Sequence, residues 1–265
     1  MCVEANAVLP CDVKDALTNA VNDEKSDIGK DILLKICENY KLAEKTDMPI
    51  CHDTGMAVFF VKIGTGVFVE GNITDAINEG VRKGYTEGYL RKSVVKDPVN
   101  RGNTNDNTPA VIHYEYFDGD YIEITFAPKG FGSENMSAIK MLSPSKGLEG
   151  VLDFVVETIS KAGSNPCPPI IVGVGIGGTF EKCAYLAKKA LIRDINKENE
   201  NEFYRQMEDT LLERINNLGI GSQGFGGTVT ALKVNVETFP THIAGMPVSV
   251  NVGCHATRHL TKIIS

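Results

Sequence analysis

The segment NPCPPIIVGVGIGGTFEKCAYLAKKAL, residues 165–191, decides the fold class of this chain. Prolines flank Cys167, and the apolar run that follows them is typical of a loop leading into a short buried strand. After paired glycines the pattern changes to a helix with one polar face over about 180–194, and a second such helix is expected over 200–217. A buried strand and helices are therefore expected to share one core.

Outward from this segment, apolar residues recur at helical spacing over 12–22, 27–45, 74–92 and 148–162. β-Rich runs broken by glycine follow Pro49 and return over residues 224–259. PAVIHYEYF (109–117) and YIEITFA (121–127) flank DGD and predict a hairpin. With no internal repeat or linker, we expect one α+β domain over residues 1–265, with a mostly helical N-terminal part, mixed β-sheet and glycine-rich loops.

Composition narrows the class of protein. The chain has 265 residues, 23% of them charged and 42% hydrophobic, which is typical of a folded globular protein. Its net charge of -7 disfavours nucleic acid or an anionic membrane as the main partner, because both need a basic face. The N-terminal sequence has neither a basic region nor an apolar signal segment, so we expect a cytoplasmic protein.

The seven cysteines fall into different contexts. An odd number in a chain expected to be intracellular favours reduced thiols or metal ligands over disulfides. Cys37 and Cys183 lie on apolar helix faces and are expected in the core, while Cys2 and Cys11 lie near a terminus and need no role.

Cys51, Cys167 and Cys254 each lie on a predicted loop beside proline or glycine. The first belongs to PICHDTGMA (49–57), which places a thiol, an imidazole, a carboxylate and a hydroxyl side by side. Such loops can hold a side chain in one direction, and three thiolates could occupy three corners of an iron–sulfur cube. Their spacing contains no CxxC signature, so three unrelated cysteines remain an alternative.

Two other functions also fit parts of the sequence. GVGIGG (173–178) matches the GxGxxG fingerprint of a nicotinamide-dependent oxidoreductase. A dinucleotide fold needs a second strand and an acidic residue soon afterwards, whereas NKENENEFYRQMEDTLLERINN (196–217) continues as helix. A non-catalytic scaffold subunit with structural cysteines is the third alternative, and it predicts a colourless protein.

Several motifs, taken in order, carry a resemblance to a known family. They are CHDTG (51–55), NTNDNTPAVIH (103–113), APKGFGSENMS (127–137), the segment 165–191 and THIAGMPVSVNVGCHATRH (241–259). Together they resemble the iron–sulfur-dependent hydro-lyases of the class I fumarase and tartrate dehydratase family. The match is to the alpha chain of the two-subunit form.

The resemblance implies a set of site residues. Three cysteines would hold a 4Fe-4S cluster whose fourth iron binds the substrate, and these are Cys51, Cys167 and Cys254. Asp53 would be the active-site carboxylate and His242 a second catalytic group. The remaining expected substrate contacts are Arg91, the loop glycines Gly130 and Gly132, and His52, which stands where the family commonly has glutamine.

The implied reaction is reversible hydration of a four-carbon unsaturated dicarboxylate, with fumarate and malate favoured and an L-tartrate dehydratase alpha subunit as the alternative. Single-chain relatives continue past the segment matching Ser265 into a second domain that supplies further cationic groups. The resemblance therefore predicts a separate beta subunit and a two-fold assembly of alpha–beta pairs.

Overall fold

The computed structural model describes residues 1–265 and divides the chain into two compact units. Unit 1 comprises residues 1–10, 39–131 and 258–265, and unit 2 comprises residues 11–38 and 132–257. The chain passes from one unit to the other inside the long helix α3 (Asp27–Thr46). The expectation that all 265 residues act as one domain stays a prediction, which a single cooperative unfolding transition would support.

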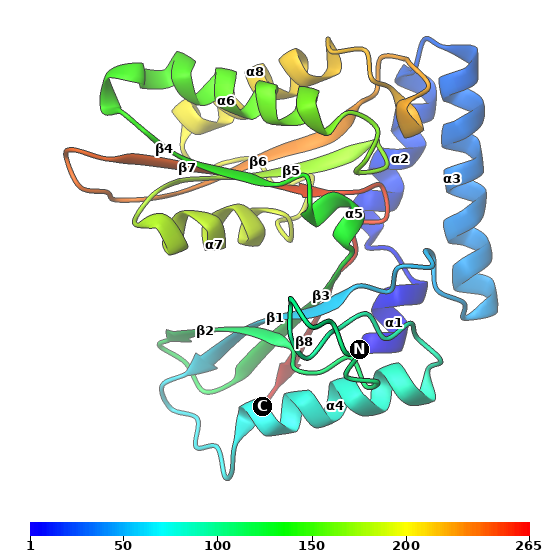
Figure 1. Ribbon diagram of the computed structural model, residues 1–265, viewed down its shortest axis with the longest axis vertical. Helices are drawn as coiled ribbons and strands as arrows, with labels where there is room; N and C mark the ends of the chain where they lie inside the picture. Colours follow the sequence, from blue (N-terminus) through cyan, green and yellow to red (C-terminus); the bar gives the residue numbers. More distant parts are fainter. The chain divides into compact units, whose positions relative to one another are not determined.

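Unit 1 is built on a four-stranded sheet in the order β2-β1-β3-β8 (Figure 1). The central strand β1 (Met56–Gly64) pairs in parallel with β2 (Val111–Phe117) and antiparallel with β3 (Ile122–Lys129). β8 (Leu260–Ile264) adds an antiparallel edge to β3. Because β1 is apolar along most of its length, it can lie in the interior with neighbours on both sides.

The predicted hairpin between 109–117 and 121–127 is wrong, because β1 lies between β2 and β3. The DGD loop instead crosses the end of β1. There the backbone N–H of Gly64 donates to Tyr121 O at 2.9 Å, and that of Gly66 donates to Gly119 O at 2.9 Å. A Cβ on Gly64 would lie only 2.4 Å from Gly119 O, so the crossing needs glycine at that position.

Helices α1 (Cys2–Ala7) and α4 (Ile73–Glu87) pack against this sheet. Asn72 caps α4 by accepting the N–H groups of Thr74 and Asp75 through its side chain. Tyr85 of α4 and Phe126 of β3 are fully buried in the shared core. The helix ends at Glu87, a little before the predicted residue 92.

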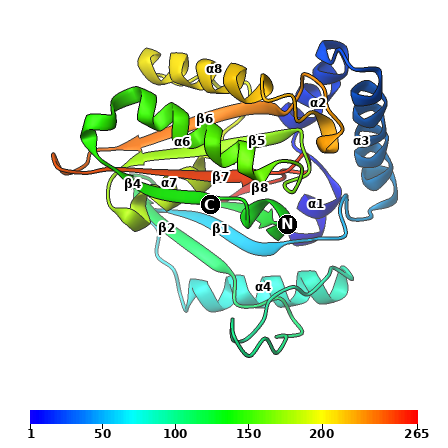
Figure 2. The ribbon, with the colours of Figure 1, turned by 45° about the horizontal axis from the view of Figure 1, so that its top comes forward.

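Unit 2 contains a second four-stranded sheet in the order β4-β7-β5-β6. Figure 2 shows these strands side by side, with β6 at the top and β4 at the bottom. β5 (Ile170–Gly177) runs parallel to β6 (Ala231–Phe239) and antiparallel to β7 (Met246–Gly253). β4 (Ala138–Leu142) closes the other edge against β7. The one-turn helix α5 (Phe131–Glu134) precedes β4, where the sequence predicted only a loop.

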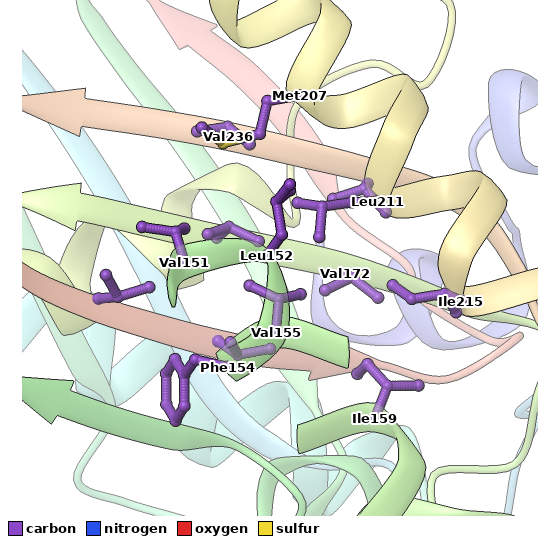
Figure 3. Close-up of a cluster of buried hydrophobic side chains, with 14 of the residues drawn as sticks. Val151, Leu152, Phe154, Val155, Ile159, Val172, Met207, Leu211, Ile215 and Val236 are labelled. Carbon is purple, nitrogen blue, oxygen red and sulfur yellow. The ribbon is translucent and has the colours of Figure 1, made fainter. Parts of the chain in front are cut away.

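Helices cover both faces of this sheet. α6 (Gly147–Ala162) and α8 (Glu202–Asn216) lie on one face, and α7 (Phe180–Ala190) lies on the other (Figure 1). In Figure 3 Leu152, Val155 and Leu211 from the two helices meet Val172 of β5. Burial of each such side chain contributes about 1.5–3 kcal/mol.

Successive residues of β5 face opposite sides of the sheet, which explains the positions of its glycines. Val172 and Val174 face the core under α6 and α8, so Gly173 and Gly175 face α7. A Cβ on Gly173 would lie 2.1 Å from Ala187 O, and one on Gly175 would lie 2.2 Å from Cys183 O. Glycine is therefore required for α7 to pack this closely against the strand.

The N-terminal helices α2 (Cys11–Asp23) and α3 confirm the predicted helical beginning. Between them, the buried Glu24 accepts N–H groups from Thr228 at 2.8 Å and Val229 at 2.9 Å. Burial alone would raise the pKa of Glu24, but hydrogen bonds from the backbone N–H groups of Ser26, Thr228 and Val229 hold its pKa below the ordinary value.

The predicted α+β class is confirmed by these helices and mixed sheets. Among the helices, none combines the length and apolar character needed to cross a membrane.

Candidate functional site

Accessibility separates the cysteines. All seven are free thiols; Cys2, Cys37 and Cys183 are buried, whereas Cys51, Cys167 and Cys254 are half-buried or exposed. Burial raises the pKa of Cys183 to about 12 and that of Cys2 to about 11. Because a cysteine binds metal as its thiolate, these two buried thiols are poor candidate ligands. Cys11 is also exposed, at the start of α2.

The CHDTG loop of unit 1 holds the carboxylate of Asp53 in one orientation. Its Oδ1 accepts the backbone N–H of Gly55 at 3.0 Å, and its Oδ2 accepts that of Phe131 at 2.9 Å. The N–H of Asp53 in turn lies 3.4 Å from Cys51 Sγ, within range of a weak hydrogen bond. Each carboxylate oxygen has two lone pairs, so both can still accept a further hydrogen bond.

Gly130 lies against the same carboxylate. A Cβ at this position would be 3.2 Å from Asp53 Oδ2, closer than most real Cβ contacts. Gly55 has a φ of +78°, and a Cβ there would lie 2.7 Å from Lys129 N. Two of the predicted site residues, Asp53 and Gly130, are thus adjacent, with glycine allowing the close approach of backbone.

The segment after α4 also meets this loop. The hydroxyl of Thr54 donates to the carbonyl of Arg91 at 3.0 Å, and the Arg91 side chain is exposed. Asn107 is fully buried and joins the two segments, because its Nδ2 donates to Gly55 O at 3.1 Å while its Oδ1 accepts the N–H of Ser93 at 2.7 Å.

Besides Asn107, two supporting residues of this loop were not singled out from the sequence. The phenol of Tyr85 donates to Thr54 O at 2.8 Å, and Arg258 Nη2 donates to Asp53 O at 2.7 Å. Arg258 is only 3% exposed. The sequence could have indicated Arg258 through its place in CHATRH and Asn107 through its place in NTNDNTP. Polar residues that are buried usually have a hydrogen-bond partner.

Cys167 and Cys254 come together in unit 2. Residue His255 donates its backbone N–H to Cys167 O at 3.3 Å, and its ring Nδ1 lies 3.0 Å from the same oxygen. Cys254 sits in a turn that Thr257 closes, through its backbone N–H at 2.9 Å and its hydroxyl at 2.7 Å from Cys254 O. Cys167 has a φ of +56°, a left-handed conformation that is costly for a residue with a side chain.

Gln223 also supports this pair and was not predicted. Its backbone N–H and its side-chain Nε2 both donate to Pro168 O, at 2.8 Å and 2.7 Å. The same Nε2 lies 3.1 Å from His255 Nδ1. No sequence signal marked Gln223, because its loop, GSQGFGG, has only the composition of a turn.

Gly132 and His52 have more open surroundings. A Cβ on Gly132 would lie 3.6 Å from Asn165 O, an ordinary contact, so this glycine lies beside the Cys167 loop without being sterically required. His52 is exposed, and its Nδ1 is 3.9 Å from Cys51 Sγ.

His242 lies away from the two cysteines of its own unit. It sits in the loop between β6 and β7, where its carbonyl accepts the N–H of Gly245 at 2.9 Å. Cys254 follows the opposite end of β7, a strand of 8 residues, which at about 3.4 Å per residue spans roughly 25 Å. Within unit 2, His242 therefore does not join Cys167 and Cys254.

The glycines of GVGIGG do not form a phosphate loop. Gly173 and Gly175 lie inside β5 and make room for α7, as described above, instead of turning the chain toward a ligand. The turn begins where β5 ends, at Gly177 and Gly178, whose φ values are +91° and +69°. Close packing of α7 against β5 therefore explains Gly173 and Gly175. A dinucleotide-binding motif would instead need its glycines in the turn after the strand.

The donor set suits a cluster better than a single ion. No group of three or more His, Cys, Asp or Glu side chains is arranged to hold one metal ion. Cys51 belongs to unit 1, whereas Cys167 and Cys254 belong to unit 2. The cysteine ligands of an iron–sulfur cube bind different iron atoms, so they need not converge on one point. Within unit 2, the accessible thiols of Cys167 and Cys254, on loops joined by a hydrogen bond, fit two such positions.

Comparison with known proteins identifies the family of this chain. A family model described as Fumarate hydratase (Fumerase) matches residues 1–262. A protein of Methanocaldococcus jannaschii, provisionally named L(+)-tartrate dehydratase subunit alpha, is 46% identical over 268 residues, covering 98% of this chain and 94% of that protein. The L(+)-tartrate dehydratase alpha subunits of Escherichia coli O157:H7 and Shigella sonnei are each 36% identical over 259 residues, 97% of this chain and 86% of theirs. The chain therefore belongs to the fumarate hydratase (Fumerase) family, as its motifs predicted.

Proposed function

We propose that this chain is the alpha subunit of an iron–sulfur-dependent hydro-lyase that reversibly adds water to a four-carbon unsaturated dicarboxylate. The observation that carries the proposal is the pairing of the Cys167 and Cys254 loops through His255, at the residues that the family motifs single out. Family membership supports the reaction class.

Cys51, Cys167 and Cys254 are the proposed ligands of a 4Fe-4S cluster. They are the accessible loop thiols, and burial disfavours Cys2 and Cys183 for the same role. Reduced thiols and an exposed cluster suit a reducing compartment, so a cytoplasmic location is part of this proposal. When bound, the cluster supplies a Lewis acid for the hydroxyl of the substrate.

Asp53 is the proposed group that hydrogen-bonds this hydroxyl or moves its proton. Its carboxylate is held by the N–H groups of Gly55 and Phe131, so it loses little freedom when substrate binds. Removal of Asp53 is expected to lower kcat by about 100-fold or more, which is typical of a positioned acid or base.

The substrate carboxylates need cationic or N–H donors. Arg91 can supply a planar, two-pronged donor beside the CHDTG loop, and the exposed His52 and the backbone at Gly130 and Gly132 are further proposed contacts. Among these side chains only Arg91 carries a permanent charge. Two buried carboxylates would be poorly neutralised by it alone, so we propose that a beta subunit supplies the remaining donors.

His242 is proposed to meet the substrate across an interface between two alpha chains. The length of β7 separates it from Cys254 of its own unit, so a role at the same substrate requires a second copy. A two-fold assembly of alpha–beta pairs provides that copy, as most soluble oligomers are closed and symmetric.

Fumarate and malate are the first proposed substrates. A second candidate, L-tartrate, is favoured by the names of the similar proteins, which are tartrate dehydratase alpha subunits. All three acids present two carboxylates on a four-carbon chain, so the same residues could bind each of them. Kinetics with fumarate, malate and L-tartrate in the assembled enzyme distinguish them.

The proposal is tested by anaerobic purification of the chain with and without its beta subunit, followed by iron analysis and hydration assays. We expect iron and a brown colour in both preparations, and activity only in the complex. Full activity of the isolated chain would contradict the need for a partner. Absence of iron from both preparations would contradict the cluster and with it the proposed function.

A further inference from the structure

The carbonyl groups on two consecutive residues, Cys167 and Pro168, receive hydrogen bonds from two different loops of unit 2. Cys167 O is contacted by the backbone N–H of His255 at 3.3 Å and by its ring Nδ1 at 3.0 Å. Pro168 O accepts the backbone N–H and the side-chain Nε2 of Gln223, at 2.8 Å and 2.7 Å. The side chains of Gln223 and His255 also meet, at 3.1 Å.

The loop that carries Gln223 approaches the Cys167 loop closely and has an unusual backbone conformation. Gln223 has φ and ψ of +53° and +16°, a left-handed conformation that is unfavourable for a residue with a side chain. Its neighbour Gly224 has a φ of +81°, and a Cβ there would lie 2.3 Å from Cβ of Ser164, on the loop that carries Cys167. The backbone is therefore held in unfavourable conformations on both sides of the contact, at Gln223 and at Cys167.

We infer that Gln223 and His255 are positioning residues that fix the Cys167 loop against the Cys254 loop and so preset the separation of two cluster ligands. The inference rests on the proposed function, because it concerns ligands of the proposed cluster. Neither side chain needs to touch iron or substrate for this role. Both act through the backbone of Cys167 and Pro168.

Strain at the ligand residue explains why such support matters. Left-handed backbone is retained only where the surroundings determine it, and without the two side chains Cys167 could relax toward ordinary φ values. Its thiol would then point elsewhere, and the cluster would lose one preset ligand direction. Outer-shell partners of metal ligands typically change affinity by roughly 10- to 100-fold when removed.

The test uses substitutions that separate hydrogen bonding from volume. Gln223→Met keeps the length of the side chain but removes its donor, and Gln206→Met on the exposed face of α8 is the matched control. His255→Asn places an N–H donor near the position of Nδ1, whereas His255→Gln places it near Nε2 and His255→Ala removes it. All chains are purified anaerobically, with the beta subunit, and reconstituted with iron and sulfide.

The readout is the rate at which iron is lost to a chelator, followed by the visible absorbance of the cluster, with the melting temperature of the metal-free chain measured in parallel. We expect Gln223→Met, His255→Ala and His255→Gln to lose iron roughly 10- to 100-fold faster than wild type. His255→Asn and Gln206→Met should stay close to wild type. Circular dichroism of the metal-free chains checks that each variant is folded.

Three results would overturn the inference: wild-type rates of iron loss in all His255 and Gln223 variants, an equal loss in His255→Asn and His255→Ala, or a loss fully accounted for by unfolding of the metal-free chain. These outcomes are distinct from failure of the proposed function. In that case the wild-type complex would bind no iron at all.

Discussion

The two ends of the unit 2 sheet differ in how their loops are held. At one end, the carbonyl groups of Cys167 and Pro168 accept the backbone N–H groups of His255, on the Cys254 loop, and of Gln223, on a third loop. At the other end, His242 lies on the loop that connects β6 to β7 across the end of β5, and its neighbour Ile243 is 92% exposed. Support from within the unit suits residues that must hold a cofactor in one geometry, whereas an exposed loop suits residues that meet another chain. We call these the cysteine end and the histidine end.

The largest expected effect follows from exchanging the proposed ligand cysteines, which are Cys167 and Cys254 at the cysteine end and Cys51 in unit 1. Serine in place of Cys51, Cys167 or Cys254 should remove nearly all bound iron, because each supplies one thiolate of the proposed cluster. His242→Ala, at the histidine end, should keep its iron and lose activity only. Iron analysis and a hydration assay of the anaerobic complex check both results.

Buried cysteines are the matched controls for this prediction. Cys37→Ser and Cys183→Ser should retain iron, since both thiols lie in the core. The assignment would be wrong if Cys183→Ser lost its iron while Cys167→Ser kept it.

A smaller effect is expected midway between the two ends, at Gly175 of β5. Gly175→Ala places a Cβ 2.2 Å from Cys183 O and should lower the free energy of unfolding by about 3 kcal/mol, as overpacking of a core does. Gly80→Ala on α4 is the control, because nothing lies within 4 Å of its added Cβ and alanine favours helix. Urea unfolding measures both, and a neutral Gly175→Ala would mean that α7 can move away from the sheet.

Glu24 allows the stability of the cysteine end to be tested as a function of pH, because its carboxylate holds the segment that leads into β6 there. Glu24→Gln should cost about 2 kcal/mol at neutral pH, since the amide NH₂ would face a backbone N–H donor. The pKa of Glu24 is lower in the folded chain than its ordinary value of 4.5, so its stabilisation is complete above that pH and is lost as pH falls through the folded value.

The difference in stability between wild type and Glu24→Gln should therefore be constant above about pH 5 and shrink in more acidic solution. Glu213→Gln, on the exposed face of α8, is the control and should show almost no difference at any pH. Urea unfolding at several pH values measures this. A difference that grew on acidification would contradict the sign of the pKa shift.

The smallest effect is expected at the histidine end. Lys182 places its ammonium 4.7 Å from the ring centroid of Tyr185 and 5.0 Å from that of Phe239, the last residue of β6. Lys182→Met should cost only about 0.5–1 kcal/mol, because exposed cation–π contacts are weak. Lys182→Arg should recover most of this loss in urea unfolding. A larger cost for Lys182→Met would show that the base of the β6–β7 loop is held as firmly as the cysteine end.

Local pattern was sufficient for most of the helices. Apolar spacing predicted 12–22, 27–45 and 148–162, and the observed α2, α3 and α6 differ by a residue or so at each end. The DGD turn did not predict the strand pairing correctly, because a third segment, β1, lies between the two strands that it connects. β1 is a better buried partner for both strands than either is for the other.

The sequence by itself determined the family, the α+β class, the burial of Cys37 and Cys183 and the loop positions of Cys51, Cys167 and Cys254, because motifs, periodicity and flanking prolines and glycines are local properties. It did not predict that Cys2, expected only near a terminus, is buried in the core of unit 1. Only the tertiary structure decided that the carboxylate of Asp53 accepts the N–H of Phe131, 78 positions along the chain. It also decided that Gln223 donates to Pro168 O beside Cys167, and that β7 separates His242 from Cys254. Such contacts depend on which strands become neighbours and in which direction they run, and no local pattern encodes that.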